Sequence, residues 1–206
     1  TRKVNVGGIF IGGDNPVRIQ SMTDKLTMNT DATVEQIIAL AKAGSDYVRI
    51  TVKGMNDAQN IKNIVALLRN RSYETPLIAD IHFNPKLAEI AAEYVDKVRI
   101  NPGNFYDKRA NFKPRIYSDE EYKTELQKIE NQFIPFLNIL KKTKTALRIG
   151  ANQGSLSDRV MSRYGDTPSG MTESVMEFLR ICKKVDFNDV VVSIKSSNTR
   201  MMVYAV

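Results

Sequence analysis

Short apolar runs alternate along the chain with segments whose apolar residues recur at helical spacing, and this alternation restricts the fold more than any other feature. Stripes such as Val34, Ile37, Ile38 and Ala41 predict helices, and Gly44 suits the end of the first one. The apolar runs that predict strands cover residues 17–22, 47–52, 77–83, 97–101, 146–150 and 190–195. Strands that alternate with helices are typical of a parallel sheet built from right-handed βαβ units.

We therefore predict an α/β fold, a TIM-type (β/α)8 barrel that is truncated after about six of its strands. The chain is expected to form one partial barrel domain over residues 1–206. Two short apolar runs around Gly7 and Gly8 predict an N-terminal β-hairpin that caps the bottom of the barrel. A Rossmann-type open sheet also fits six strands, but no Gly-x-Gly-x-x-Gly follows an early strand.

Residues 104–144 are unusually long for one connection between a strand and a helix, so we interpret them as an insertion. A long amphipathic helix is predicted inside this insertion, with Tyr122, Leu126, Ile129 and Phe133 on one face. Because proline lacks a backbone N–H, Pro135 is expected to interrupt that helix.

Composition limits the class of protein and the kind of partner. Of the 206 residues, 42% are hydrophobic and 26% are charged, which is typical of a soluble globular protein. No apolar run is long enough to cross a membrane and no secretory signal is present, so a cytoplasmic protein is expected. The single cysteine, Cys182, excludes an internal disulfide framework and cannot make a metal site by itself. The net charge of +7 favours an anionic partner, either a nucleic acid or a phosphorylated metabolite.

Polar side chains interrupt the predicted strands in matching phase. Strands of a parallel barrel are covered on both faces and normally read as continuous apolar runs. Here one face of each strand is apolar and suits the outer helices, so the other face is expected to look into the barrel. Buried cations need an anionic partner, and arginine suits bidentate contacts to phosphate. The polar residues of this inner face are Arg49, Asp80, His82, Arg99, Asn101, Arg148 and Lys195.

The loops that follow two of the strands agree with an anion site. Residues 101–104 predict a tight turn, and residues 150–155 form a small-residue loop that contains Asn152. Ser155 and Asp158 have the spacing of a capping box at a helix start, where backbone N–H groups are available to an anion. Asp80 and His82 are also compatible with a hydrolase-type metal site, but the chain has no second histidine, and we expect no metal here.

Six motifs carry a resemblance to a known family. In order, they are Ile19-Gln20-Ser21-Met22-Thr23, Val48-Arg49-Ile50-Thr51-Val52, Leu77-Ile78-Ala79-Asp80-Ile81-His82-Phe83, Val98-Arg99-Ile100-Asn101-Pro102-Gly103-Asn104, Arg148-Ile149-Gly150-Ala151-Asn152-Gln153-Gly154-Ser155-Leu156 and Val192-Ser193-Ile194-Lys195-Ser196-Ser197. With these motifs the chain resembles the barrel domain of 4-hydroxy-3-methylbut-2-enyl-diphosphate synthases, the iron–sulfur enzymes of the methylerythritol phosphate route to isoprenoids. The long segment after Asn104 is similar to the larger form found in plants, chlamydiae and some other bacteria. Without a transit peptide, a bacterial origin is expected.

The resemblance implies an oxidoreductase that reductively opens 2-C-methyl-D-erythritol 2,4-cyclodiphosphate and eliminates water. It also implies a [4Fe-4S] cluster, electrons from ferredoxin or flavodoxin, and a homodimer of the full-length enzyme. The cluster ligands lie in a C-terminal domain that this chain does not contain, so the chain alone is expected to be inactive and to hold no catalytic residue. By the resemblance, the residues that bind substrate are Arg49, Asp80, His82, Arg99, Asn101, Arg148, Asn152 and Lys195.

Two other functions fit parts of the pattern. A pterin-binding barrel of the dihydropteroate synthase type has a similar architecture and an anion pocket. A basic module that binds RNA through residues 108–115 would account for the net charge, although no RNA-binding motif supports it and we expect no nucleic-acid partner.

Overall fold

The computed structural model describes residues 1–107 and 116–206. Its contacts divide the chain into two compact units, one of residues 1–99 and 139–147 and the other of residues 100–138 and 148–206. Within the described residues, six strands form one sheet in the order β3-β4-β5-β6-β7-β8, and β1 and β2 form a separate hairpin. The pairs β3–β4, β4–β5 and β5–β6 are parallel, as the alternation of strands and helices predicts.

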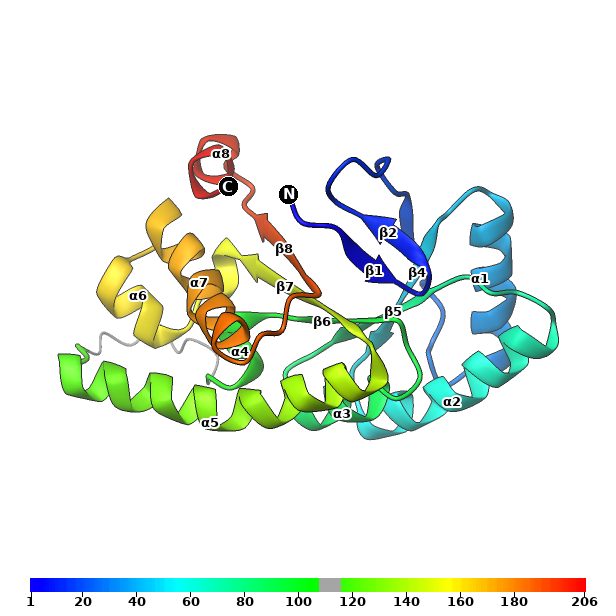
Figure 1. Ribbon diagram of the computed structural model, residues 1–206, viewed down its shortest axis with the longest axis horizontal. Helices are drawn as coiled ribbons and strands as arrows, with labels where there is room; N and C mark the ends of the chain where they lie inside the picture. The colour runs from blue at the N-terminus through cyan, green and yellow to red at the C-terminus, as the bar shows by residue number, and fades with distance from the viewer. Residues whose placement is uncertain (108–115) are drawn as a thin grey trace. The chain divides into compact units, whose positions relative to one another are not determined.

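The first unit consists of the hairpin, the first strands of the sheet and the helices that follow them (Figure 1). Helices α1, α2 and α3 pack in sequence order, and each contacts β4 or β5. The elements are β1 (Val4–Val6), β2 (Ile9–Ile11), β3 (Gln20–Met22), α1 (Thr30–Lys42), β4 (Tyr47–Val52), α2 (Met55–Asn70), β5 (Leu77–Ile81) and α3 (Pro85–Ala91). The strands β6 (Lys97–Ile100) and β7 (Ala146–Asn152) and the helix α5 (Asp119–Thr143) are divided between the two units.

The predicted N-terminal hairpin is confirmed, with Val4 and Val6 buried. It lies against the amino ends of the strands, because the Tyr47 hydroxyl at the start of β4 donates to the Ile9 carbonyl at 3.1 Å. At the turn, Gly7 has a φ of +58°, and a Cβ there would lie 2.7 Å from atoms of Pro76 and Asp96. The hairpin therefore packs against the residues that immediately precede β5 and β6, at the amino ends of these strands.

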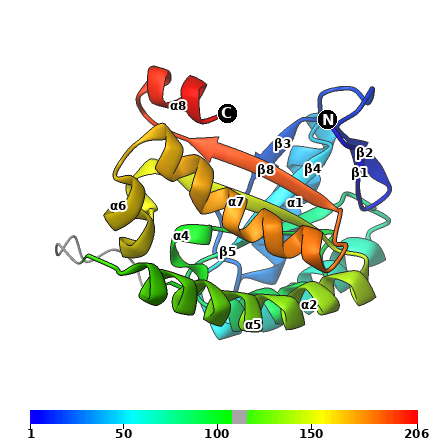
Figure 2. The same ribbon diagram turned by 60° about the vertical axis from the view of Figure 1, so that its left-hand side comes forward.

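The second unit contains the remaining helices (Figure 2). Helix α7 contacts α4, α6, α8 and β8. The core of the second unit contains an aromatic cluster, which consists of Phe105, Tyr106, Phe133, Phe136 and Phe178. The remaining elements are α4 (Pro102–Phe105), the short 3-10 helix η1 (Gln153–Ser155), α6 (Asp158–Tyr164), α7 (Pro168–Lys184), β8 (Val190–Lys195) and α8 (Thr199–Ala205).

Two local predictions were wrong. Helix α5 continues through Pro135 to Thr143 instead of stopping there, because Phe136 and Leu137 on the far side of the proline are buried and hold the next turn in place. The predicted capping box of Ser155 and Asp158 does not form. Ser157 caps α6 instead, and its side chain accepts from the Val160 backbone N–H.

Several predicted boundaries move by one or more residues. The first strand of the sheet begins at Gln20, and Val17 is 96% exposed just after Pro16. The predicted turn at residues 101–104 starts a short helix, because the Asn101 side chain caps it and Pro102 occupies its first position. The prediction that residues 104–144 form an insertion stays a prediction, and residues 108–115 lie outside the described part of the chain.

Candidate functional site

Three of the predicted site residues meet on the first unit. Arg99 Nη1 donates to Asp80 Oδ1 at 3.0 Å, and Arg49 Nε lies 3.6 Å from Asp80 Oδ2. The side chains of Arg49, Asp80 and Arg99 are 17%, 8% and 12% exposed. Strand register explains both contacts. Asp80 pairs with Arg99 on β6, and on β4 it pairs with Thr51, which lies two residues from Arg49 on the same face of the strand. We call this set the Arg49–Asp80–Arg99 group.

The Arg49–Asp80–Arg99 group has one negative and two positive charges. A carboxylate has two oxygens, and Asp80 uses a different one for each guanidinium. One carboxylate cancels one unit of charge, so the group keeps a net positive charge of about one. A polyanion placed beside it would gain charge-assisted contacts in a region that is largely shielded from water.

The sequence did not predict the role of Met22 in this group. Its Sδ accepts from Arg49 Nη2 at 3.0 Å and from Nε at 3.3 Å. Met22 is the register partner of Arg49, on the edge strand β3. A prediction of the parallel register between β3 and β4, which places Met22 beside Arg49, would have indicated this contact.

His82 lies just beyond the end of β5. Its backbone N–H donates to the Val52 carbonyl, and its half-buried ring meets Phe83 edge to face at 5.8 Å between centroids. Phe83 has a φ of +65°, a conformation that side chains rarely adopt, and it is 56% exposed. The structure thus places His82 at the carboxyl end of its strand, as a site residue requires, and its predicted role in binding stays a prediction.

The second unit contains the other four predicted site residues. Arg148 is 8% exposed, and its Nε donates to Ser193 Oγ of β8 at 3.1 Å. Asn101 uses both ends of its amide inside the protein, accepting from the Gly103 N–H and donating to Ser155 Oγ at 2.7 Å. Ser155 in turn donates to the Asn152 carbonyl. Asn101 thereby fixes the loop that carries Asn152.

Asn152 and Lys195 line one cavity of about 390 Å³ at the carboxyl ends of β7 and β8. Lys195 is exposed, unlike Arg148. It lies on β8, the end strand of the sheet, in which no residue is fully buried. The other lining residues, which the sequence did not predict as site residues, are Gln153, Gly154, Asp166, Ser196 and Ser197. Asp166 comes from the connection between α6 and α7, where no local pattern indicates a site.

The described residues do not suit a metal centre. Among them, no group of three or more His, Cys, Asp or Glu side chains is placed to hold a metal ion. The one cysteine, Cys182, is buried in α7, and burial raises the pKa of its thiol from 9.0 to about 12. A thiol with that pKa stays protonated at neutral pH and is a poor ligand. In the described part of the chain, no helix is both long and apolar enough to cross a membrane.

The parallel strands, the helices that follow them and the hairpin at the amino ends of the strands define an α/β domain of the TIM-barrel type. The family model described as the GcpE TIM-barrel domain matches residues 1–206, so the chain belongs to this family. The barrel class predicted from the sequence is therefore confirmed.

Curated relatives agree with the family. The chain is 58% identical, over 99% of its length, to a protein of Phocaeicola vulgatus named 4-hydroxy-3-methylbut-2-en-1-yl diphosphate synthase (flavodoxin). It is 52% identical over its whole length to the protein of that name from Protochlamydia amoebophila. A chloroplastic protein of Oryza sativa, named as the ferredoxin type, is 48% identical over the whole chain. The chain covers 33%, 31% and 28% of these proteins, so it spans about a third of their length.

Solved structures show similarity of fold alone. The chain resembles a 3-keto-D-glucoside 4-epimerase of E. coli with a TM-score of 0.56 and 12% identity, over 87% of this chain and 68% of the epimerase. A β-methylaspartase of Clostridium tetanomorphum gives 0.50 and 12%, over 86% of this chain and 36% of that one. The whole-chain match places the chain in the GcpE family. The basic segment 108–115, on which the RNA-binding alternative depends, lies outside the described residues.

Proposed function

We propose that this chain supplies the substrate-binding part of an enzyme that makes 4-hydroxy-3-methylbut-2-enyl diphosphate. The substrate is 2-C-methyl-D-erythritol 2,4-cyclodiphosphate, whose ring is opened reductively with loss of water. The observation that carries the proposal is the Arg49–Asp80–Arg99 group, in which two guanidiniums share one carboxylate. Two guanidiniums around one carboxylate suit a ligand with two phosphates, and the names of the relatives support the same product.

Each predicted site residue has a role in this proposal. Arg49 and Arg99 bind phosphate oxygens, and Asp80 holds both guanidiniums in place before the substrate arrives. Arg148, Asn152 and Lys195, which belong to the second unit, are the other residues predicted to bind the substrate. His82 donates to the substrate from the end of β5, and Asn101 acts partly through the loop that it fixes.

A [4Fe-4S] cluster would supply the two electrons, with flavodoxin or ferredoxin as their source. The described residues do not fit such a cluster, since they offer no set of ligands and Cys182 is buried. The proposal therefore places the cluster ligands outside this chain. This chain binds and orients the substrate, and it does not turn over alone. We further propose that the complete enzyme is a cytoplasmic homodimer.

The test is Arg148→Ala in the complete protein that contains this chain. Arg148 is chosen because it is a predicted substrate-binding residue that is only 8% exposed and lies on β7, away from the surface ion pairs of α7. We expect the Kd for the cyclic diphosphate, measured by calorimetry, to rise by about ten- to a hundredfold, as loss of a charge-assisted contact predicts. Visible absorption should show the cluster unchanged.

Arg180→Ala is the matched control, since Arg180 pairs with Glu173 on the surface of α7. It should leave the Kd unchanged. Unchanged binding by Arg148→Ala would overturn the role assigned to that arginine.

A further inference from the structure

Three loops of the second unit meet at the cavity that Lys195 lines. One loop is η1, which follows β7, another connects α6 to α7, and the third follows β8. Gln153 is the residue that joins them. Its Nε2 donates to Asp166 Oδ2 at 2.9 Å, and its Oε1 accepts from Ser196 Oγ at 2.5 Å.

The orientation of the Gln153 amide follows from its neighbours. Ser196 Oγ already accepts from the Asn198 backbone N–H at 2.9 Å, so its hydroxyl hydrogen is available for Gln153. An ionised Asp166 can only accept. The carbonyl of Gln153 must therefore face Ser196 and its NH₂ must face Asp166. The result is a directional chain of hydrogen bonds that crosses the three loops.

We infer that Gln153 is a positioning residue for the anion site. It adjoins Asn152 in sequence, and its partner Ser196 adjoins Lys195, so the chain of hydrogen bonds fixes the loop ends that carry both residues. This inference rests on the proposed function, because it assigns the cavity to a phosphate of the substrate.

Substitution of Asp166 distinguishes a positioning role of this carboxylate from a purely electrostatic one. Asp166 lines the same cavity as Lys195. If it acted only through its charge, it would repel a phosphate, and its removal would tighten binding. If it acts as the acceptor that holds Gln153, its removal frees the loops and weakens binding. The two accounts predict opposite signs for one substitution.

The experiment measures binding of inorganic pyrophosphate and of the cyclic diphosphate to the complete protein by calorimetry. Asp166→Ala and Gln153→Ala are each expected to raise both Kd values by about fivefold, the order expected for one lost intramolecular hydrogen bond. The double variant of Gln153→Ala and Asp166→Ala should bind both ligands no more weakly than Gln153→Ala alone, because the two residues act through one contact. Asp166→Asn should bind no more weakly than the unsubstituted protein, since the amide oxygen introduced there still accepts from Gln153 and the charge that repels phosphate is removed.

Steady-state turnover supplies a readout that a purely structural role would not give. For Gln153→Ala, KM should rise about fivefold while kcat stays within about twofold, because the loops orient the substrate in the ground and transition states alike. The matched control is Gln127→Ala, which removes an exposed glutamine of α5 that bonds to Asn131. It should change neither constant.

Tighter binding by Asp166→Ala, or unchanged binding by Gln153→Ala, would overturn the inference. Lys195→Ala and Arg148→Ala separate this failure from failure of the proposed function. If these two variants weaken binding while the Gln153 and Asp166 variants do not, only the positioning role is wrong. If none of the four affects binding, the assignment of the second unit to the substrate is wrong as well.

Discussion

A single carboxylate, Asp80, holds two arginines in the Arg49–Asp80–Arg99 group. Removing its charge would take away the carboxylate that two largely buried guanidiniums share. We expect Asp80→Asn to lower the free energy of unfolding by about 3–5 kcal/mol, the usual cost of breaking a buried ion pair. Denaturant titration of the complete protein, followed by circular dichroism, measures this change.

Pyrophosphate should restore more stability to Asp80→Asn than to the unsubstituted protein, because the ligand would replace the missing negative charge. Asp57→Asn is the control, since Asp57 accepts from a backbone N–H in an exposed position. If pyrophosphate stabilises Asp80→Asn and the unsubstituted protein equally, Arg49 and Arg99 do not bind it.

The buried thiol of Cys182 predicts a dependence of stability on alkaline pH. Burial raises its pKa to about 12, whereas the exposed thiol of the unfolded chain ionises near pH 9. Between these values the unfolded state loses its proton first. The contribution of Cys182 to stability is therefore complete below pH 9 and is lost as the pH rises toward 12. Cys182→Ala should show a shallower loss of stability over that range in thermal melts.

Gly103 illustrates a constraint on how two elements approach each other. A Cβ at this position would lie 1.8 Å from the Ser155 carbonyl oxygen. Gly103→Ala is therefore expected to push α4 away from η1 and to break the bond between Asn101 and Ser155. We expect a loss of about 2–3 kcal/mol of stability by denaturant titration. Gly154→Ala, where a Cβ meets no atom within 4 Å, should cost well under half as much.

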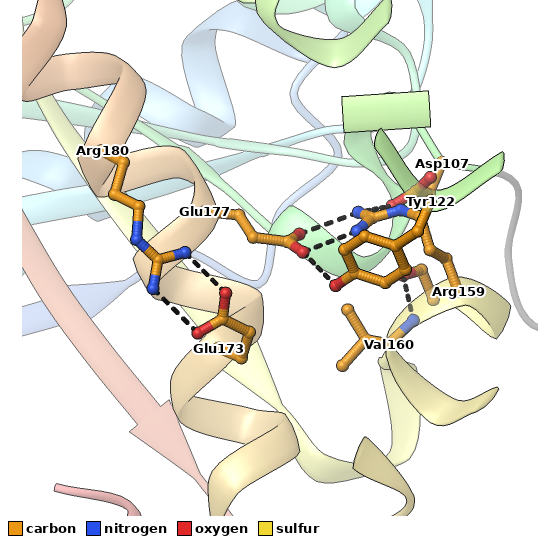
Figure 3. A network of polar contacts seen from close by, with 8 residues as sticks. Asp107, Tyr122, Arg159, Val160, Glu173, Glu177 and Arg180 are labelled. Carbon is orange, nitrogen blue, oxygen red and sulfur yellow. Dashed lines mark hydrogen bonds and ion pairs between the residues drawn. The ribbon is translucent and has the colours of Figure 1, made fainter. Parts of the chain in front are cut away.

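At the scale of elements, one buried arginine ties α6 to two other segments directly and to α5 through Glu177 (Figure 3). Arg159 donates to both oxygens of Glu177 on α7, at 2.6 and 2.8 Å, and to Asp107 after α4 at 2.9 Å. The hydroxyl of Tyr122 on α5 donates to Glu177 as well. Burial, followed by this bond to Glu177, raises the pKa of Tyr122, so its hydroxyl remains a donor.

Arg159→Met should leave Glu177 and Asp107 without their shared cation. We expect a loss of about 3–5 kcal/mol in the free energy of unfolding. The matched control is Arg180→Met. It removes the exposed partner of Glu173, both on α7, and should lower the free energy of unfolding by about 0.5 kcal/mol or less. Equal midpoints of denaturation for the two variants would contradict a structural role for Arg159.

At the scale of the whole molecule, the two end strands of the six-stranded sheet are β3 and β8. Apolar side chains are exposed near both, including Val17 and Ile19 before β3 and Val192 on β8. Unpaired strand edges are templates for association with another chain. We therefore expect the isolated 206-residue chain to self-associate with rising concentration in sedimentation equilibrium. Val192→Lys should reduce this association, whereas Val203→Lys, on an exposed part of α8, should not.

The sequence predicts the strands and the polar face of the sheet well, because a period of two is a local property of each strand. The common phase of Arg49, Asp80 and Arg99 was read from the sequence, but the contact of Asp80 with both arginines was not predicted, because it depends on strand register. The sequence did not predict features that depend on tertiary packing. The continuation of α5 past Pro135 depends on the burial of Phe136 and Leu137, and the place of Asp166 in the cavity depends on a connection between two helices.

The shared carboxylate in the Arg49–Asp80–Arg99 group also has a consequence for selectivity. A neutral polyol that reached these arginines would gain hydrogen bonds from the guanidiniums but no attraction between opposite charges. A ligand with several negative charges would gain the remaining electrostatic energy as well. If the group binds the substrate as proposed, it favours the phosphorylated form of a carbon skeleton over the unphosphorylated form, and precursors that lack the phosphates are expected to compete poorly even when their shape fits.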